Sequence, residues 1–83
     1  MYILGMPLIF TKDGFRLFFY SNEAREPVHV HVEKAEAVAK FWIKPIRLAR
    51  NDGFKSSEIK KIIRIIFENQ QLVEEKWNEH FKK

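Results

Sequence analysis

Residues 26–34 read EPVHVHVEK and alternate valine with ionisable side chains. Successive side chains of a β-strand point to opposite faces, so His29, His31 and Glu33 would share one face, with about 6.5–7 Å between alternate residues. Histidine titrates near neutral pH, and a neighbouring carboxylate can tune it for proton transfer. The pattern therefore predicts a candidate catalytic group made of His29, His31 and Glu33.

Two other interpretations of this pattern stand beside the catalytic one. Two strand histidines and a carboxylate can share a zinc ion, but this spacing occurs in any alternating strand and no further His or Asp lies close in the sequence. The three residues can also form the plain solvated face of a strand. We expect no metal ion and no cofactor, so an enzyme built on this face would be a metal-independent ribonuclease that uses acid–base chemistry.

The strand that follows brings further side chains to the same face. A two-residue turn between the two strands would place His31 opposite Lys40 and His29 opposite Trp42. Basic groups contact phosphate while flat rings stack on bases, so this face suits RNA. The alternatives are a solvated face and a protein–protein patch marked by Phe18 and Trp42. The candidate nucleic-acid-binding residues are Arg16, Tyr20, Lys40 and Trp42.

Four strands are expected to position these residues. Asp13-Gly14 predicts a tight hairpin turn, because both residue types accept positive φ angles. The polar stretch that follows the second strand ends in Pro27, which favours extended geometry, and Pro45 ends the fourth strand. Residues 46–50 fit either a single helical turn or a short strand. The predicted strands are residues 7–11, 15–20, 28–33 and 37–43.

Residues 56–83 contain neither glycine nor proline and predict a helix that Ser56 or Ser57 caps. At about 100° per residue, one apolar stripe follows this segment, which fits one long helix or two collinear helices with a break near Asn69. Ile65 and Leu72 lie off the stripe and form a second seam. This seam either tucks under an edge of the domain or contacts a partner or a second copy of the chain. The stripe consists of Ile59, Ile62, Ile63, Ile66, Val73, Trp77 and Phe81.

The order of these elements predicts the fold class. Strands followed by helix favour an α+β domain, with a small antiparallel sheet of about four strands and a long C-terminal helix packed on one face. The 83 residues are enough for one core, so residues 1–83 are expected to form a single domain.

Composition excludes some classes of protein. Without cysteine, neither disulfides nor a cysteine zinc site can stabilise the fold. No apolar run is long enough to span a membrane and residues 1–10 show no targeting pattern, so a cytoplasmic protein is expected. The 15 basic and 11 acidic residues give a net charge of +4, which permits an anionic partner.

Several stretches of the chain match a recognisable pattern. They are DGF at 13–15, FFYSNE at 18–23, EPVHVHVE at 26–33, AKFW at 39–42 and WNEHF at 77–81. Together they resemble the bacterial domain-of-unknown-function 4160 (DUF4160) family, and the resemblance covers residues 6–81. The chain departs from it at residues 34–36, where relatives tend to have glycine.

The resemblance implies a small bacterial protein that is often encoded beside a second small protein, of the DUF2442 family. Such pairs look like toxin–antitoxin modules. The expectation is therefore a component of a toxin–antitoxin-like pair that binds a small cognate protein and RNA. The alternative is a non-enzymatic module that binds another protein or a second copy of itself. The family supplies no catalytic residues that could be carried over to this chain.

Overall fold

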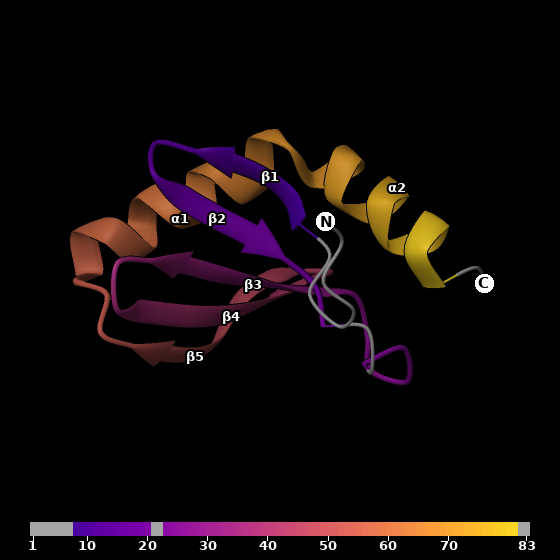
Figure 1. Ribbon diagram of the computed structural model, residues 1–83, viewed down its shortest axis with the longest axis horizontal. Coiled ribbons are helices and arrows are strands. Elements are labelled where there is room, and N and C mark those ends of the chain that lie inside the picture. Colours follow the sequence, from indigo (N-terminus) through magenta and orange to yellow (C-terminus); the bar gives the residue numbers. More distant parts are fainter. Residues whose placement is uncertain (1–7, 21–22, 82–83) are drawn as a thin grey trace.

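The computed structural model describes residues 8–20 and 23–81, which form one antiparallel sheet and two helices (Figure 1). The strands follow one another in the order β1-β2-β3-β4-β5. The predicted α+β class is confirmed, while the sheet has five strands instead of about four. The elements are β1 (Leu8–Lys12), β2 (Phe15–Phe18), β3 (His29–Lys34), β4 (Ala37–Ile43), β5 (Ile46–Asp52), α1 (Ser56–Glu68) and α2 (Gln70–Phe81).

Tight turns set the register within two pairs of strands, β1 with β2 and β3 with β4. Asp13 and Gly14 connect β1 to β2 with φ angles of 53° and 84°, as a type I′ turn requires. Ala35 begins the turn between β3 and β4 with φ 54°, a conformation that glycine accepts more easily. The predicted first strand included Pro7, which lies outside the described residues.

The predicted pairing of β3 with β4 is confirmed. His31 lies opposite Lys40 and His29 lies opposite Trp42. On β2, Phe18 pairs with His31. Because paired residues of adjacent strands share a face, these side chains gather on one side of the sheet, which we call the outer face.

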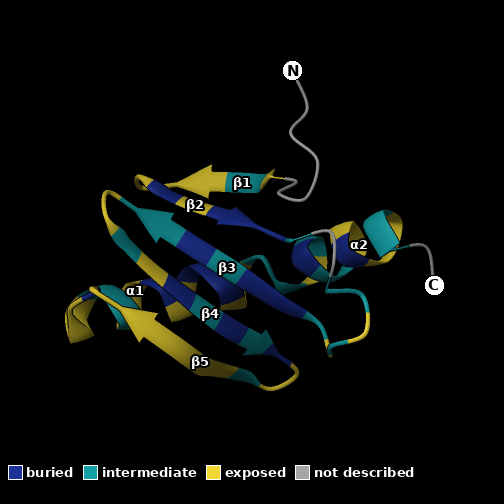
Figure 2. Cartoon of the chain, turned by 60° about the horizontal axis from the view of Figure 1, so that its bottom comes forward, coloured by how far each residue is buried: buried dark blue, intermediate teal, exposed yellow. Residues whose placement is uncertain are grey.

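Residues 46–50, which fitted a helical turn or a short strand, belong to the fifth strand. A turn with a cis Lys44–Pro45 peptide bond leads from β4 into β5. Six of the seven residues of β5 are exposed, and the register shifts between Lys40 and Phe41 of β4. The strand thus forms an edge of the sheet that is open on both faces (Figure 2).

The C-terminal segment is two helices and not one long helix. The break falls at Asn69, as the two-segment alternative expected, but α2 turns away from the line of α1 (Figure 1). The Asn69 side chain donates a hydrogen bond to the Ile65 carbonyl oxygen, and Gln70 donates one to the Ile43 carbonyl oxygen of β4. Ser56 is already the first residue of α1, so the cap position falls on Lys55.

The core lies between the inner face of the sheet and the two helices (Figure 2). As predicted, the inner face is apolar, with Leu17, Val30, Val32 and Phe41 all buried. The helical stripe differs from the prediction at two positions, since Ile63 is 36% exposed whereas Ile65 is only 4% exposed. The buried helical residues are Ile62, Ile65, Ile66, Val73 and Trp77. Within the described part of the chain, no helix is long and apolar enough to cross a membrane.

Candidate functional site

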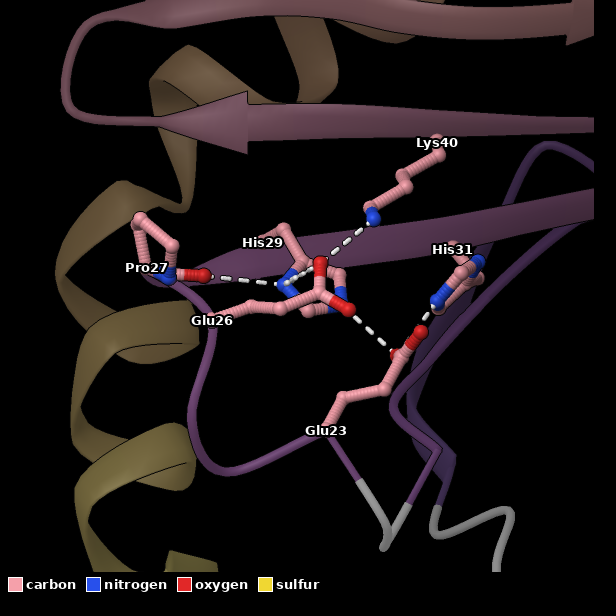
Figure 3. Close-up of polar contacts among 6 residues, drawn as sticks. All are labelled: Glu23, Glu26, Pro27, His29, His31 and Lys40. Carbon is pink, nitrogen blue, oxygen red and sulfur yellow. Dashed lines mark hydrogen bonds and ion pairs between the residues drawn. The ribbon is translucent and has the colours of Figure 1, made fainter.

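The two histidines of β3 meet a carboxylate that comes from the loop before this strand. One oxygen of Glu23, Oε1, lies 2.6 Å from His29 Nε2 and 2.7 Å from His31 Nε2 (Figure 3). The alternation of β3 places both rings on the outer face, and the loop folds back so that Glu23 reaches between them. We refer to Glu23, His29 and His31 as the carboxylate–histidine cluster.

His29 is the buried member of this cluster, with no exposed surface. Its Nδ1 lies 2.9 Å from the carbonyl oxygen of Pro27, so it donates a hydrogen bond to the backbone. The ring also lies against two tryptophans, with centroid distances of 5.6 Å to Trp42 and 5.1 Å to Trp77. Packing and hydrogen bonding together fix the orientation of this imidazole.

His31 is the member that solvent reaches, with 15% of its side chain exposed. Its ring lies 4.5 Å from the ring of Tyr20 and 5.7 Å from the ring of Phe18. It lines a hollow of about 360 Å³ on the outer face. We call it the His31 hollow. Side chains from β2, β3, β4, β5 and the segment between β2 and β3 line it, among them Tyr20, Glu23, Lys40 and Arg50.

Burial and hydrogen bonding shift the pKa values of this cluster. Burial alone would raise the pKa of the Glu23 carboxyl group, but the hydrogen bonds from His29 and His31 outweigh it and leave the pKa below its ordinary value. Burial lowers the pKa of His31, because the charged ring loses solvation, and the attraction of Glu23 offsets only part of this effect. Glu23 therefore stays ionised and His31 stays neutral near pH 7.

These shifts predict that the protein loses stability in acid. Both folded pKa values lie below those of the unfolded chain, so the unfolded chain binds more protons. The free energy of unfolding therefore decreases as the pH is lowered. The His31 contribution should disappear as pH falls below 6.5 and the Glu23 contribution as it falls below 4.5. Urea unfolding of metal-free protein at a series of pH values measures both. The Glu23→Gln variant should lose the lower transition and Glu33→Gln should keep it, and equal curves for all three proteins would contradict the assignment.

The structure does not bring Glu33 to the histidines, although the sequence grouped the three residues as catalytic. Glu33 instead forms an ion pair with Arg16 of β2, its cross-strand neighbour. Sequence reasoning missed Glu23, which replaces Glu33 in this cluster. The signal that could have found it is a carboxylate in the polar loop that leads into β3, because such loops place side chains over the strand end that they join.

The four predicted nucleic-acid-binding residues divide into two groups. Lys40 lines the His31 hollow, pairs with Glu26 at 2.6 Å and lies 4.6 Å from the ring centroid of Trp42. Tyr20 lines the same hollow, and Trp42 lines a second hollow of about 500 Å³ with Lys44 and Arg47. Arg16 stands apart on β2. Residues that the sequence did not single out, Arg47 and Arg50, thus add two cations from β5.

The two predicted partner-binding residues are placed differently from one another. Ile65 belongs to the core, as the alternative of a seam tucked under the domain expected, and it leaves little surface for a partner. Leu72 on α2 is half-buried. Among residues 8–20 and 23–81, the large apolar side chain most open to solvent is Phe67, at 70%, and Ile63 lies one turn before it on α1.

A family model describes the same part of the chain. It matches residues 14–78, and its description is a domain of unknown function, DUF4160. The chain belongs to the DUF4160 family. The DUF4160 match runs from the first hairpin into α2 and includes all three members of the carboxylate–histidine cluster. No curated protein and no solved structure matches the chain.

The geometry of this DUF4160 site allows two kinds of chemistry. A carboxylate that orients two imidazoles can support proton transfer, with His31 as the group that faces solvent. Two imidazole nitrogens and one carboxylate oxygen are also a ligand set for a transition-metal ion. Both uses depend on Glu23 and on the ring positions of His29 and His31, while Glu33 contributes to neither.

Proposed function

We propose that the protein binds single-stranded RNA on the outer face of its sheet and works with a small partner protein in a toxin–antitoxin-like pair. The observation that carries the RNA proposal is the arrangement of cations and rings along β4 and β5. The His31 hollow presents Tyr20 with Lys40 and Arg50, and the neighbouring hollow presents Trp42 with Lys44 and Arg47. Cations next to flat rings suit a strand of phosphates and unstacked bases.

The charges of this surface support an anionic ligand. Lys40 and Arg50 lie directly opposite each other on adjacent strands, and like charges at such positions are unfavourable. Each is neutralised by a carboxylate, Glu26 for Lys40 and Asp52 for Arg50. The Arg50 pair is exposed at both ends, and exposed ion pairs contribute only about 0–1 kcal/mol, so a phosphate can replace Asp52 at little cost.

The test compares two double variants that remove the same charge from opposite sides of the molecule. Arg47→Ala with Arg50→Ala should weaken the binding of a short single-stranded RNA. The slope of log affinity against log salt should fall by about 1.4, because each lost phosphate contact on a single strand changes it by about 0.7. Fluorescence anisotropy at several salt concentrations measures this slope. Lys60→Ala with Lys61→Ala on α1 is the control. An equal change of the slope in this control would show that RNA binding depends on the net charge of the protein and not on the residues of the outer face.

The outer side of α1 favours the partner-binding half of the proposal. Phe67 and Ile63 expose apolar surface next to the exposed cations Lys60 and Arg64. Such aromatic side chains within a charged rim are typical of protein interfaces, and the positive charge selects an acidic partner. We take this partner to be the small DUF2442-type protein that the family resemblance implies.

Co-expression with this partner tests the interface. Phe67→Ser should abolish co-purification, and Leu48→Ser, which changes a large apolar residue exposed by 40% on β5, should leave it intact. Growth of the host with and without the partner then shows whether the pair behaves as a toxin and its antidote. If the partner still co-purifies with the Phe67→Ser variant, the interface does not depend on this surface of α1.

A further inference from the structure

The ring of His29 faces an oxygen acceptor at each nitrogen. The Pro27 carbonyl oxygen, 2.9 Å from Nδ1, can only accept, so Nδ1 carries a hydrogen atom. In a neutral ring Nε2 then has a lone pair, yet it lies 2.6 Å from Oε1 of Glu23, which as a carboxylate oxygen also only accepts. Two lone pairs do not approach this closely by themselves. A proton or a metal cation has to lie between them.

The positions of the three ligand atoms suit a metal ion. One ring nitrogen of each histidine and one carboxylate oxygen of Glu23 all lie within 4.8 Å of one another. A tetrahedral zinc ion, about 2.0–2.1 Å from each ligand, would hold these atoms about 3.3 Å apart. Glu23 would therefore retreat by about 0.6 Å and the two nitrogens would approach by about 1.5 Å at most. Because Glu23 lies on a loop and its side chain is 19% exposed, rotation of that side chain can supply its retreat. The approach of the two nitrogens has to come from the ring of His31, whose side chain is 15% exposed, because Pro27 and two tryptophans hold the ring of His29.

The surroundings of His29 are those of a metal ligand. Metal-bound histidines commonly donate their other N–H group to a carbonyl or carboxylate oxygen, which fixes the ring and leaves one nitrogen for the ion. The Pro27 carbonyl oxygen does this for His29. The rings of Trp42 and Trp77 hold the same imidazole from other sides, at centroid distances of 5.6 and 5.1 Å.

We propose that Glu23, His29 and His31 form a binding site for one divalent transition-metal ion of the zinc class. Two imidazole nitrogens exclude magnesium and calcium as the preferred ions, because those ions favour oxygen ligands. Three protein ligands leave at least one coordination position open. Since His31 and Glu23 line the His31 hollow, the open position faces that hollow, where Lys40 and Tyr20 also lie. The site is independent of RNA binding and stands whether or not the outer face binds a nucleic acid.

Cobalt is the probe for this site, because bound Co²⁺ has a visible absorption spectrum whereas Zn²⁺ has none. The full chain is stripped with a chelator and titrated with Co²⁺, and elemental analysis gives the metal content of the zinc-loaded protein. We expect one Co²⁺ ion per chain, with an absorption spectrum typical of Co²⁺ at a low coordination number. Zn²⁺ should displace the bound Co²⁺ completely. A folded wild-type chain that binds neither ion would overturn the proposal.

Single-residue variants locate the ion. Glu23→Gln and His31→Ala should each weaken binding by at least about 100-fold, since even the loss of a residue that only orients a ligand costs 10–100-fold. Glu33→Gln, the same change two residues beyond His31 on the same strand, should bind the ion as the wild-type protein does. Circular dichroism confirms that each variant is folded. Equal losses in Glu33→Gln and Glu23→Gln, or unchanged binding in Glu23→Gln, would assign the ion to other residues.

Discussion

Replacing Trp77 with alanine is expected to lower the free energy of unfolding by about 3–5 kcal/mol, the range for large aromatic residues in a core. Trp77 is only 2% exposed and is the main anchor of α2. Its ring lies against Phe19 at 5.2 Å, His29 at 5.1 Å and Phe81 at 4.3 Å between centroids. A domain of this length has about 4–12 kcal/mol of stability in total, so the substitution should remove between about a quarter and the whole of it.

The control for this experiment is Phe67→Ala on α1. It also removes an aromatic ring from a helix, but Phe67 is 70% exposed, so its loss should change the free energy of unfolding by no more than about 0.5 kcal/mol. Urea denaturation followed by circular dichroism measures both variants. A Trp77→Ala variant as stable as Phe67→Ala would mean that α2 does not depend on this contact for its position.

His29→Ala is the second change for which a large effect is expected, about 3 kcal/mol. The substitution opens a cavity at a fully buried position between two tryptophans. It also removes one of the two hydrogen bonds that Glu23 accepts and the bond to Pro27. A half-buried carboxylate that loses a donor is costly because its solvation is not restored.

The neighbouring substitution separates stability from function. His31→Ala should cost only about 1 kcal/mol, since His31 lies at the rim of the hollow and solvent can replace its hydrogen bond. Thermal or urea unfolding of the two variants measures the difference. If His31→Ala proved as destabilising as His29→Ala, the assignment of His29 as the structural member would be wrong. Functional experiments should therefore use His31 variants, because a substitution at His29 lowers the stability of the fold together with any function of the ring.

The alternation of side chains along the strands was enough to predict the outer face. Because Val30 and Val32 must be buried, His29 and His31 have to point the other way, and a two-residue turn then fixes Lys40 and Trp42 opposite them. These local rules have period two and need no knowledge of the rest of the fold. The hairpin at Asp13-Gly14 follows from the same kind of local chemistry.

The parts that sequence did not predict depend on tertiary contacts or lack a periodic pattern. Glu23 lies in a loop, where no repeat relates a residue to the strand below it. The edge strand β5 is exposed on both faces, so its side chains do not alternate clearly. The predicted helical stripe counted a constant 100° per residue through the whole segment. The break at Asn69 interrupts this count, so the buried side of α1 need not line up with that of α2. As a result Ile65 is buried where Ile63 was expected.

The two-layer arrangement has a consequence for the RNA ligand and the partner protein proposed above. Helix α1 covers one side of the sheet (Figure 2). The His31 hollow is lined by side chains of the outer face, on the other side, whereas Phe67 is 70% exposed on α1 and the buried residues Ile62 and Ile66 lie between α1 and the sheet. A protein docked on Phe67 cannot cover the hollow by contact. The proposed partner and the proposed RNA ligand should accordingly occupy the molecule at the same time, as a three-component complex, so that neither has to leave before the other arrives.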